Sequence, residues 1–377
     1  MTMSHPPRQP RGAVLPDFPW DTIAAEKTRA ANHPAGLINL SVGAPVDPVA
    51  PSIQLALAEN GHDGGYPTTH GTPALREALA KHMATRYNMT GIAPDNILPC
   101  IGTKELIAGL PTLLGVGEGH TVVIPEIAYP TYEVAALLSG ARIARADSLL
   151  KLGPSSPTLM FINTPGNPTG KVLGQAHLQK VVEFSRSRDC IVASDECYLG
   201  LGYDPDNPPV SILDERVSGG DHRNLLAIHS LSKTSNMAGY RAGWITGDPA
   251  LIAELLAIRK HTGFMVPTPI QAAMIAAVED ADQEWLQHQR YAQRREVLIP
   301  ALTQAGFTID NSEAGLYLWI TRGESSRDTL AWFAERGILV APGDFYGPRG
   351  KDHVRVALTG TLEQMHAAAD RIVATDR

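Results

Sequence analysis

A lysine followed eight residues later by an arginine could do chemistry. Lys233 and Arg241 lie in HSLSKTSNMAGYRAGW, residues 229–244, which reads as a strand that runs into a loop of small residues. A partly desolvated lysine can lose its proton, and its amine can then condense with a carbonyl. Ser230, Ser232 and Arg241 suit a phosphate group, which arginine can bind through two parallel hydrogen bonds. Taken alone, the string is explained more simply by an exposed lysine beside a structural arginine.

An acidic residue ends an apolar strand farther upstream. Asp195 lies in ASDECY, residues 193–198, and is separated from Lys233 by enough chain for one crossover and the next position in a sheet. A carboxylate there could keep a heterocyclic nitrogen protonated, so that the ring draws in the electrons of a broken C–H bond. Tyr198 could hydrogen-bond a phenolic oxygen on that ring, whereas we interpret Cys197 as a packing residue. A helix N-cap is the ordinary alternative for Asp195.

Asn167 and Tyr129 follow two further strand-like segments. Asn167 lies in NTPGNPTGKVL, residues 163–173, where it offers an amide to the same phenolic oxygen, although turn chemistry alone would explain the loop. Tyr129 lies in PEIAYPTYEVA, residues 125–135, where it could stack on a flat ring or serve as a core aromatic.

Two further positions could bind anions. IGTKELIAGL, residues 101–110, reads as a strand, a glycine and a helix, so the backbone N–H groups of Gly102, Thr103 and Lys104 would face an anion at the helix start. Arg355 lies within the apolar strand HVRVAL. A buried guanidinium needs an anionic partner, which could be a substrate carboxylate or a structural Asp or Glu.

These residues require elements that place strand ends together. From residue 97, short β-branched runs alternate with helical stretches, which predicts an α/β fold with a mostly parallel sheet. Ligands of such sheets bind at the carboxyl ends of the strands. Beyond residue 267 two helical patterns, three strand-like pieces and a closing helix predict a smaller α+β lobe. We predict a large domain at 47–264 and a small domain from 1–46 and 265–377, with residues 1–16 as a flexible lead-in.

Composition excludes several classes of protein. The 377 residues are 44% hydrophobic and 19% charged, and the net charge of −7 disfavours nucleic acid and anionic membranes as partners. Three cysteines without CxxC spacing and scattered histidines without HExxH spacing favour neither a disulfide framework nor a metal site. Without an apolar run of membrane length or a signal-like start, the sequence favours a soluble, cytoplasmic protein.

The order of these motifs resembles a known family. G-T-K-E, A-Y-P-T-Y, N-T-P-G-N-P-T-G, S-D-E-C-Y, S-L-S-K with an arginine eight residues on, and V-R-V-A-L are similar to the motifs of fold-type I pyridoxal-phosphate aminotransferases of class I/II. The likeness extends over residues 37–373. It implies a large domain with a mostly parallel sheet, a smaller α+β domain, and pyridoxal 5′-phosphate as the cofactor.

The resemblance also implies a role for each matching residue. Lys233 would form the Schiff base with the cofactor and move the proton, and Asp195 would pair with the pyridinium nitrogen. Tyr66 would reach a neighbouring subunit's phosphate, which implies a homodimer with shared active sites. The implied cofactor-binding residues are Thr103, Lys104, Tyr129, Asn167, Asp195, Tyr198, Ser230, Ser232, Lys233, Arg241 and Tyr66, with Lys233, Asp195 and Tyr198 as the catalytic ones.

The resemblance implies amino-acid and 2-oxo-acid substrates. Arg355 would bind the substrate α-carboxylate, with Gly43 and Asn167 beside it. Strings such as LPDFPWDTI and RKHTGFMVPTPIQAAM are similar to actinobacterial N-succinyldiaminopimelate aminotransferases, which implies diaminopimelate and lysine synthesis. Two alternatives stay open: an aminotransferase for aspartate, alanine or aromatic substrates, and a lyase or decarboxylase on the same fold. A cofactor-binding regulator is disfavoured, because the residues before the likeness begins leave too little room for a DNA-binding domain. For a distal carboxylate, Arg259, Lys260 and Lys104 are candidates by position only.

Overall fold

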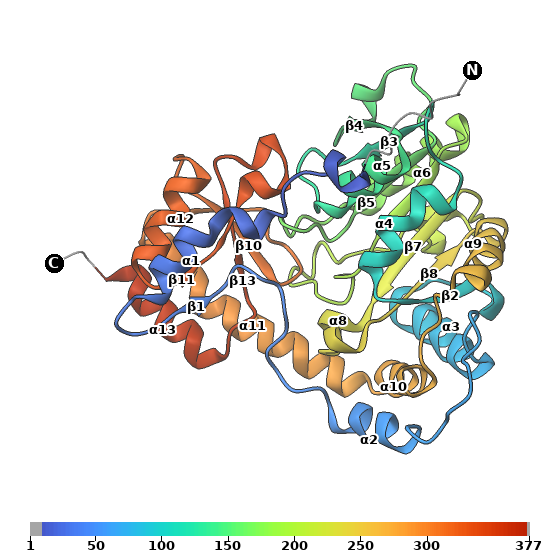
Figure 1. Ribbon diagram of the computed structural model, residues 1–377, viewed down its shortest axis with the longest axis horizontal. Helices are drawn as coiled ribbons and strands as arrows, with labels where there is room; N and C mark the ends of the chain where they lie inside the picture. Colours follow the sequence, from blue (N-terminus) through green and yellow to red (C-terminus); the bar gives the residue numbers. More distant parts are fainter. Residues whose placement is uncertain (1–9, 375–377) are drawn as a thin grey trace, which may run out of the picture.

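The computed structural model describes residues 10–374, so the expectation of a flexible lead-in lies outside the described residues for positions 1–9. Within the described part, the chain forms two lobes, each built on its own sheet (Figure 1). Residues 11–14 form a short 3-10 turn, and a second 3-10 turn follows at 19–23.

The larger lobe contains a seven-stranded sheet in the order β2-β8-β7-β6-β5-β3-β4. Every strand except β8 runs in one direction, whereas β8 is antiparallel to both of its neighbours. The predicted mostly parallel sheet is therefore confirmed. Its strands are β2 (Ile97–Ile101), β3 (Thr121–Ile124), β4 (Arg142–Arg145), β5 (Leu159–Asn163), β6 (Ile191–Asp195), β7 (Leu225–Ser230) and β8 (Ala242–Gly247).

Helices cover both faces of this sheet because the strands are apolar on both sides. Alternate residues of each strand enter two separate hydrophobic clusters, one on each face. One cluster is completed by α4 (Thr103–Leu113), α5 (Thr131–Ser139) and α9 (Pro249–Thr262). The other is completed by α3 (Pro73–Tyr87), α6 (Gln175–Arg188) and α10 (Thr268–Glu279), with α2 (Pro51–Glu59) packed on α10.

The smaller lobe is an α+β structure, as predicted. Its antiparallel sheet has the order β12-β13-β10-β9, and a parallel pair joins β1 (Ile38–Asn39) to β11 (Ile338–Leu339). Helix α11 extends from beside α10 into this lobe (Figure 1). The remaining elements are α1 (Ala24–Ala31), β9 (Thr308–Asp310), β10 (Tyr317–Thr321), α12 (Ser326–Glu335), β12 (Ala341–Pro342), β13 (Val354–Ala357), α13 (Leu362–Val373) and α11 itself (Ala281–Gln304).

The packing of α10 bears on the division into domains. Its buried side chains join the hydrophobic cluster of the seven-stranded sheet. We therefore propose that α10 belongs to the large domain and that the division follows it, later than the predicted position after residue 264.

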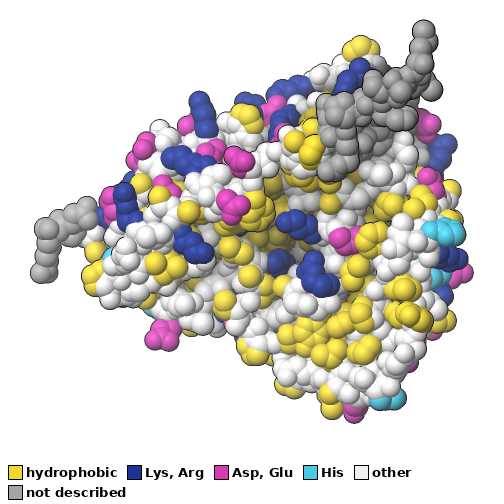
Figure 2. Space-filling view, viewed as in Figure 1, with side chains coloured by type: hydrophobic (Ala, Val, Ile, Leu, Met, Phe, Trp, Pro, Cys, Tyr) yellow, Lys and Arg dark blue, Asp and Glu magenta, His cyan; other side chains and the backbone are white. Residues whose placement is uncertain are grey.

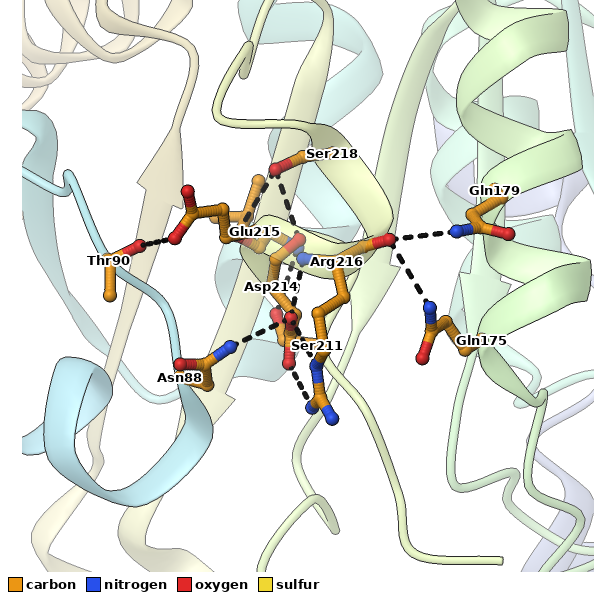
Figure 3. Close-up of polar contacts among 10 residues, drawn as sticks. Asn88, Thr90, Gln175, Gln179, Ser211, Asp214, Glu215, Arg216 and Ser218 are labelled. Atoms are coloured by element: carbon orange, nitrogen blue, oxygen red, sulfur yellow. Dashed lines mark hydrogen bonds and ion pairs between the residues drawn. The ribbon is translucent and has the colours of Figure 1, made fainter.

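A polar cluster fixes the connection between β6 and β7. Asp214 caps the short helix α7 (Glu215–Ser218), accepting hydrogen bonds from the Arg216 backbone and side chain and from the Asn88 amide at 3.1 Å (Figure 3). The Arg216 carbonyl in turn accepts a hydrogen bond from Gln179 of α6. These contacts hold three separate parts of the chain together on the outer side of the large lobe.

The structure also bears on two excluded classes. No helix within residues 10–374 is long and apolar enough to cross a membrane. In that same range, no group of three or more His, Cys, Asp or Glu side chains is arranged to hold a metal ion.

Candidate active site

Several predicted site residues meet at the carboxyl ends of adjacent strands. Asn163, at the end of β5, is the register partner of Asp195 at the end of β6, and Ser230 ends the neighbouring β7. The Asn163 side chain donates to the Asp195 carbonyl at 2.9 Å and accepts from the Asn167 backbone N–H at 2.7 Å. Asn163 therefore fixes the position of Asn167 relative to β6.

Lys233 lies in the short helix α8 (Leu231–Thr234), directly after β7. Ser230 caps this helix by accepting a hydrogen bond from the Ser232 backbone N–H at 3.1 Å. The Lys233 ammonium donates a hydrogen bond to the Gly43 carbonyl. Burial lowers the pKa of Lys233 below its usual value, since desolvation disfavours the charged amine. The structure therefore places a buried amine of lowered pKa at the strand ends.

Asp195 is a buried carboxylate without a cationic partner among the described residues. Its Oδ2 accepts a hydrogen bond from the Tyr132 hydroxyl at 2.7 Å, and its Oδ1 accepts one from the Cys197 backbone N–H at 3.2 Å. Burial raises the pKa of Asp195 because no charged neighbour compensates the desolvation. A protonated ring nitrogen would supply the missing positive charge. Asp195 does not cap an α-helix, which leaves the N-cap alternative unsupported.

The surroundings of Cys197 agree with its interpretation as a packing residue. Burial raises the pKa of its thiol well above the usual value, so the thiol is not a nucleophile near neutral pH. Its sulfur contacts the Thr103 hydroxyl at 3.5 Å.

Arg241 approaches the start of α4. Gly102, the residue before α4, has φ +78°, and a Cβ atom there would collide with the Arg241 guanidinium. Glycine therefore allows both the left-handed backbone and the close approach. Gly243, the register partner of Ser230, lies against the Thr103 side chain. The start of α4, the end of β7 and Arg241 thus lie together in one corner, and binding of a phosphate there stays a prediction.

Arg355 has polar partners but no structural carboxylate within residues 10–374. Its Nη1 donates to the Asn167 amide oxygen at 2.9 Å, and its Nη2 donates to the Ser41 carbonyl at 2.6 Å. Its guanidinium carbon lies 4.0 Å from the centre of the Tyr317 ring, and its buried Nε has no acceptor. Of the two partners that the sequence left open, the contacts favour an external carboxylate.

Gly43 and Tyr198 are joined by a residue that the sequence did not reveal. A Cβ atom at Gly43 would collide with the Tyr317 hydroxyl, which lies 3.2 Å from the Tyr198 hydroxyl. The Tyr317 side chain therefore lies against Gly43, Tyr198 and Arg355, close to Lys233.

Tyr129 and Lys104 border a cavity of about 840 Å³ between the two lobes. The Tyr129 ring meets Tyr132 edge to face at 5.7 Å, and the Lys104 ammonium lies 5.7 Å from the centre of the Phe18 ring. The Lys104 side chain faces this cavity, so its part in phosphate binding stays a prediction that would involve the backbone N–H. Figure 2 shows Lys and Arg side chains around a hollow between the lobes.

Tyr66 lies apart from the other predicted residues. Its side chain is 94% exposed on the loop between α2 and α3. Its predicted role requires a second subunit and stays a prediction.

Sequence reasoning missed several residues that complete the site. Tyr132 could have been found from the second tyrosine of A-Y-P-T-Y, which is one helical turn from Tyr129. Asn163 begins the motif that supplied Asn167. Ser41 and Tyr317 carried no local signal, because their contacts join distant parts of the chain.

Comparisons with known proteins agree with this arrangement. The chain is 59% identical over 367 residues to a probable aminotransferase of Mycobacterium tuberculosis, and the alignment covers 97% of this chain and 87% of the relative. It is 51% identical over 358 residues to a 4-dedimethylamino-4-oxo-anhydrotetracycline transaminase of Streptomyces rimosus, and the alignment covers 95% of this chain and 99% of the relative. It is 31% identical over 377 residues to an LL-diaminopimelate aminotransferase of Moorella thermoacetica, covering 95% of each.

A solved structure gives the same result for the fold. An aminotransferase from Neisseria meningitidis superposes with a TM-score of 0.85 at 30% identity, covering 96% of this chain and 99% of that one. The profile described as aminotransferase class I and II matches residues 35–372. The chain belongs to the class I and II aminotransferases, which use pyridoxal 5′-phosphate.

Proposed function

We propose that this aminotransferase transfers an amino group between glutamate and N-succinyl-2-amino-6-oxopimelate in diaminopimelate and lysine synthesis. The proposal rests on one observation above the others: the cavity beside Tyr129 contains a lysine, Lys104, that forms no ion pair within residues 10–374. The 31% identity to an LL-diaminopimelate aminotransferase supports the same substrate class.

The residues at the strand ends fit the cofactor. Asp195 is a buried carboxylate that needs a cation, and the corner formed by Gly102, Arg241 and the start of α4 suits a phosphate. Lys233 would bind the cofactor aldehyde, with Tyr129 beside the ring and Tyr198 and Asn167 near its oxygen. When bound, pyridoxal phosphate accepts the electrons left by the broken Cα–H bond.

In this arrangement each side chain has a separate task. Lys233, whose pKa is lowered by burial, takes the proton from Cα and returns it as a general acid. Arg355 binds the α-carboxylate and thereby fixes which Cα bond faces Lys233. Asn167 holds the Arg355 guanidinium in place through its amide oxygen.

The cations near the cavity separate into paired and unpaired groups. Arg145 pairs with Glu133 at 2.6 Å, and Arg327 pairs with Asp344 at 2.7 Å. Lys104 is exposed, and its ammonium lies over the Phe18 ring without an ion pair among residues 10–374. A carboxylate at the far end of a substrate would therefore find Lys104 available without breaking an ion pair.

The other two candidates for the distal carboxylate fit less well. Arg259 is fully buried in α9 and pairs with Glu105 at 2.8 Å, so it serves the packing of α9 against α4. Lys260 is an exposed residue of α9 and does not border the cavity.

A second candidate substrate class has its own support. The relative that is 51% identical is named as a transaminase of a tetracycline intermediate. Phe18, Trp20 and Phe345 line the cavity and would suit a flat, fused-ring substrate. Such a substrate would depend on these aromatic side chains instead of on Lys104.

A substrate panel with one pair of variants tests the proposal. We expect kcat/KM to be highest for N-succinyl-LL-diaminopimelate, compared with aspartate, alanine, N-acetylornithine and the tetracycline ketone. Lys104→Gln should lower kcat/KM for N-succinyl-LL-diaminopimelate about tenfold and leave alanine unchanged, since one charge-assisted contact is lost. Lys260→Gln is the matched control. Equal activity on all substrates, or an equal loss for alanine, would contradict the assignment.

We further propose that the enzyme is a cytoplasmic homodimer in which Tyr66 completes the partner's phosphate site. The 94% exposure of Tyr66 leaves its hydroxyl available to a second copy. Mixing Lys233→Ala and Tyr66→Ala subunits should restore activity, because one site in each mixed dimer is intact. No recovery on subunit exchange would argue against shared sites.

A further inference from the structure

Two buried hydrogen-bond donors of the smaller lobe have no acceptor among residues 10–374. They are the Arg355 Nε and the Tyr346 hydroxyl, in side chains that are 3% and 1% exposed. Leaving a buried donor unpaired costs about 1–3 kcal/mol, so each such group needs an explanation.

The position of Tyr346 is fixed by its own backbone and by its ring. It is the last residue of η6 (Gly343–Tyr346), and its carbonyl accepts a hydrogen bond from the Ala128 N–H at 2.8 Å. Its ring meets the Trp319 ring edge to face, with centres 6.0 Å apart. These contacts bind η6 to the loop that carries Tyr129 and to β10.

The hydroxyl of Tyr346 belongs to the same environment as Arg355. The Arg355 guanidinium carbon lies 5.3 Å from the centre of the Tyr346 ring. The groups whose charges would act on this hydroxyl are Arg355, Tyr317 and Tyr129. Burial raises its pKa, so the phenol stays protonated and can donate.

Comparison with the other buried tyrosines shows that Tyr346 is the exception. Tyr132 donates to Asp195, Tyr291 donates to the Lys233 carbonyl at 3.2 Å, and the Tyr198 and Tyr317 hydroxyls pair with each other. Among residues 10–374, Tyr346 is the tyrosine whose buried hydroxyl finds no protein partner. Packing alone would be served equally well by phenylalanine.

We propose that the Tyr346 hydroxyl binds substrate, donating a hydrogen bond to the α-carboxylate that Arg355 holds. The two unpaired donors would then share one anion, which has enough lone pairs for both. This inference rests on the proposed role of Arg355 but is independent of the substrate's distal part. It makes Tyr346 a recognition residue for the α-carboxylate of every substrate, donor and acceptor alike.

The test removes one oxygen atom. Tyr346→Phe should weaken binding of glutamate and of alanine by the same factor, about tenfold to a hundredfold, because both lose a hydrogen bond to a charged group. The dissociation constants are measured from the cofactor absorbance change in the half-reaction of the holoenzyme. The limiting rate should change little, and Tm without substrate should not fall, since the lost hydroxyl has no protein partner.

A matched variant and a second measurement separate the possible results. Tyr203→Phe removes a hydroxyl that donates to the Gly315 carbonyl at 2.8 Å and should leave both dissociation constants unchanged. If Arg355→Gln fails to weaken glutamate binding, the proposed role of Arg355 is wrong. If Arg355→Gln weakens it but Tyr346→Phe does not, only the inference on Tyr346 is overturned. A lower Tm in Tyr346→Phe with unchanged binding would likewise overturn it.

Discussion

Two buried aspartates in neighbouring parts of the large lobe have opposite surroundings. Asp214 has the Arg216 guanidinium, the Arg216 N–H and the Asn88 amide as partners, and these hold its pKa below the usual value despite the desolvation (Figure 3). Asp195 has two neutral donors and, among residues 10–374, no cationic partner, and burial raises its pKa.

The comparison teaches how a structural cluster differs from a site. Around Asp214 the protein satisfies its own polar groups, and nothing further is required for stability. Around Asp195 and Arg355, within residues 10–374, a buried acceptor lacks a cation and buried donors lack an anion. The proposed cofactor and substrate would complete these interactions.

The largest effect should come from Lys233→Ala. Without the amine, no group takes the Cα proton, and turnover should fall by about 10⁴-fold, the upper range for general-base catalysis. The measurement is single-turnover kinetics with added cofactor, and folding is checked by the Tm. Turnover at the normal rate would show that Lys233 does not carry the chemistry.

Asp195→Asn should separate activity from stability. The amide keeps the shape but loses the charge that a protonated ring nitrogen needs, so kcat should fall about a hundredfold or more. Stability of the cofactor-free protein should not decrease, because an uncompensated buried charge is removed. A large loss of Tm in the cofactor-free protein would mean that Asp195 is chiefly structural.

Asp214→Asn should give the opposite result. It weakens the N-cap of α7 and the ion pair with Arg216, and the free energy of unfolding should fall by about 1–2 kcal/mol. We expect kcat per folded molecule to stay within about twofold of the original value. Denaturant unfolding and active-site titration measure the two quantities, and a loss of kcat without a loss of stability would reverse the comparison.

The smallest effect is expected in the pH dependence of stability, and it concerns Glu196, the residue next to Asp195. Burial raises the pKa of Glu196 to about 7, and its carboxylate accepts hydrogen bonds from the Ser194 hydroxyl and the Ile212 N–H on the other face of β6. A raised folded-state pKa gives stability that is complete below the unfolded value and is lost as the pH rises through the folded value.

The stability of the original protein should therefore fall relative to Glu196→Gln between about pH 5 and about pH 8. Unfolding curves across this range measure the difference. A difference that does not change with pH would show that Glu196 does not titrate there.

The sequence predicted which residues gather at the strand ends, because these positions are set by local patterns. Lys233, Asp195 and Asn167 each follow an apolar strand, and parallel strands bring such ends together. The alternation of strands and helices likewise predicted the α/β lobe. The direction of β8 was not specified, because apolar runs carry no information on strand direction.

Contacts between distant segments could not be predicted in this way. Arg355 meets a carbonyl 314 residues away, and Lys233 meets one 190 residues away. A sequence pattern gives no measure of which carbonyl will lie opposite a side chain after folding. For the same reason it could not show that Tyr346 ends without a partner.

The cavity of about 840 Å³ has a further consequence for how this enzyme can diversify. Its walls come from residues 15–22, 129–134 and 344–348, together with Lys104, Ala108, Arg145 and Arg327, whereas Lys233 stands on α8 and Asp195 on a strand of the seven-stranded sheet. Segments 129–134 and 344–348 also carry Tyr129 and Tyr346, so mutations that alter selectivity without disturbing the cofactor or the α-carboxylate are expected mainly in residues 15–22. Directed evolution toward new amines should therefore begin in that segment, with the sheet left unchanged.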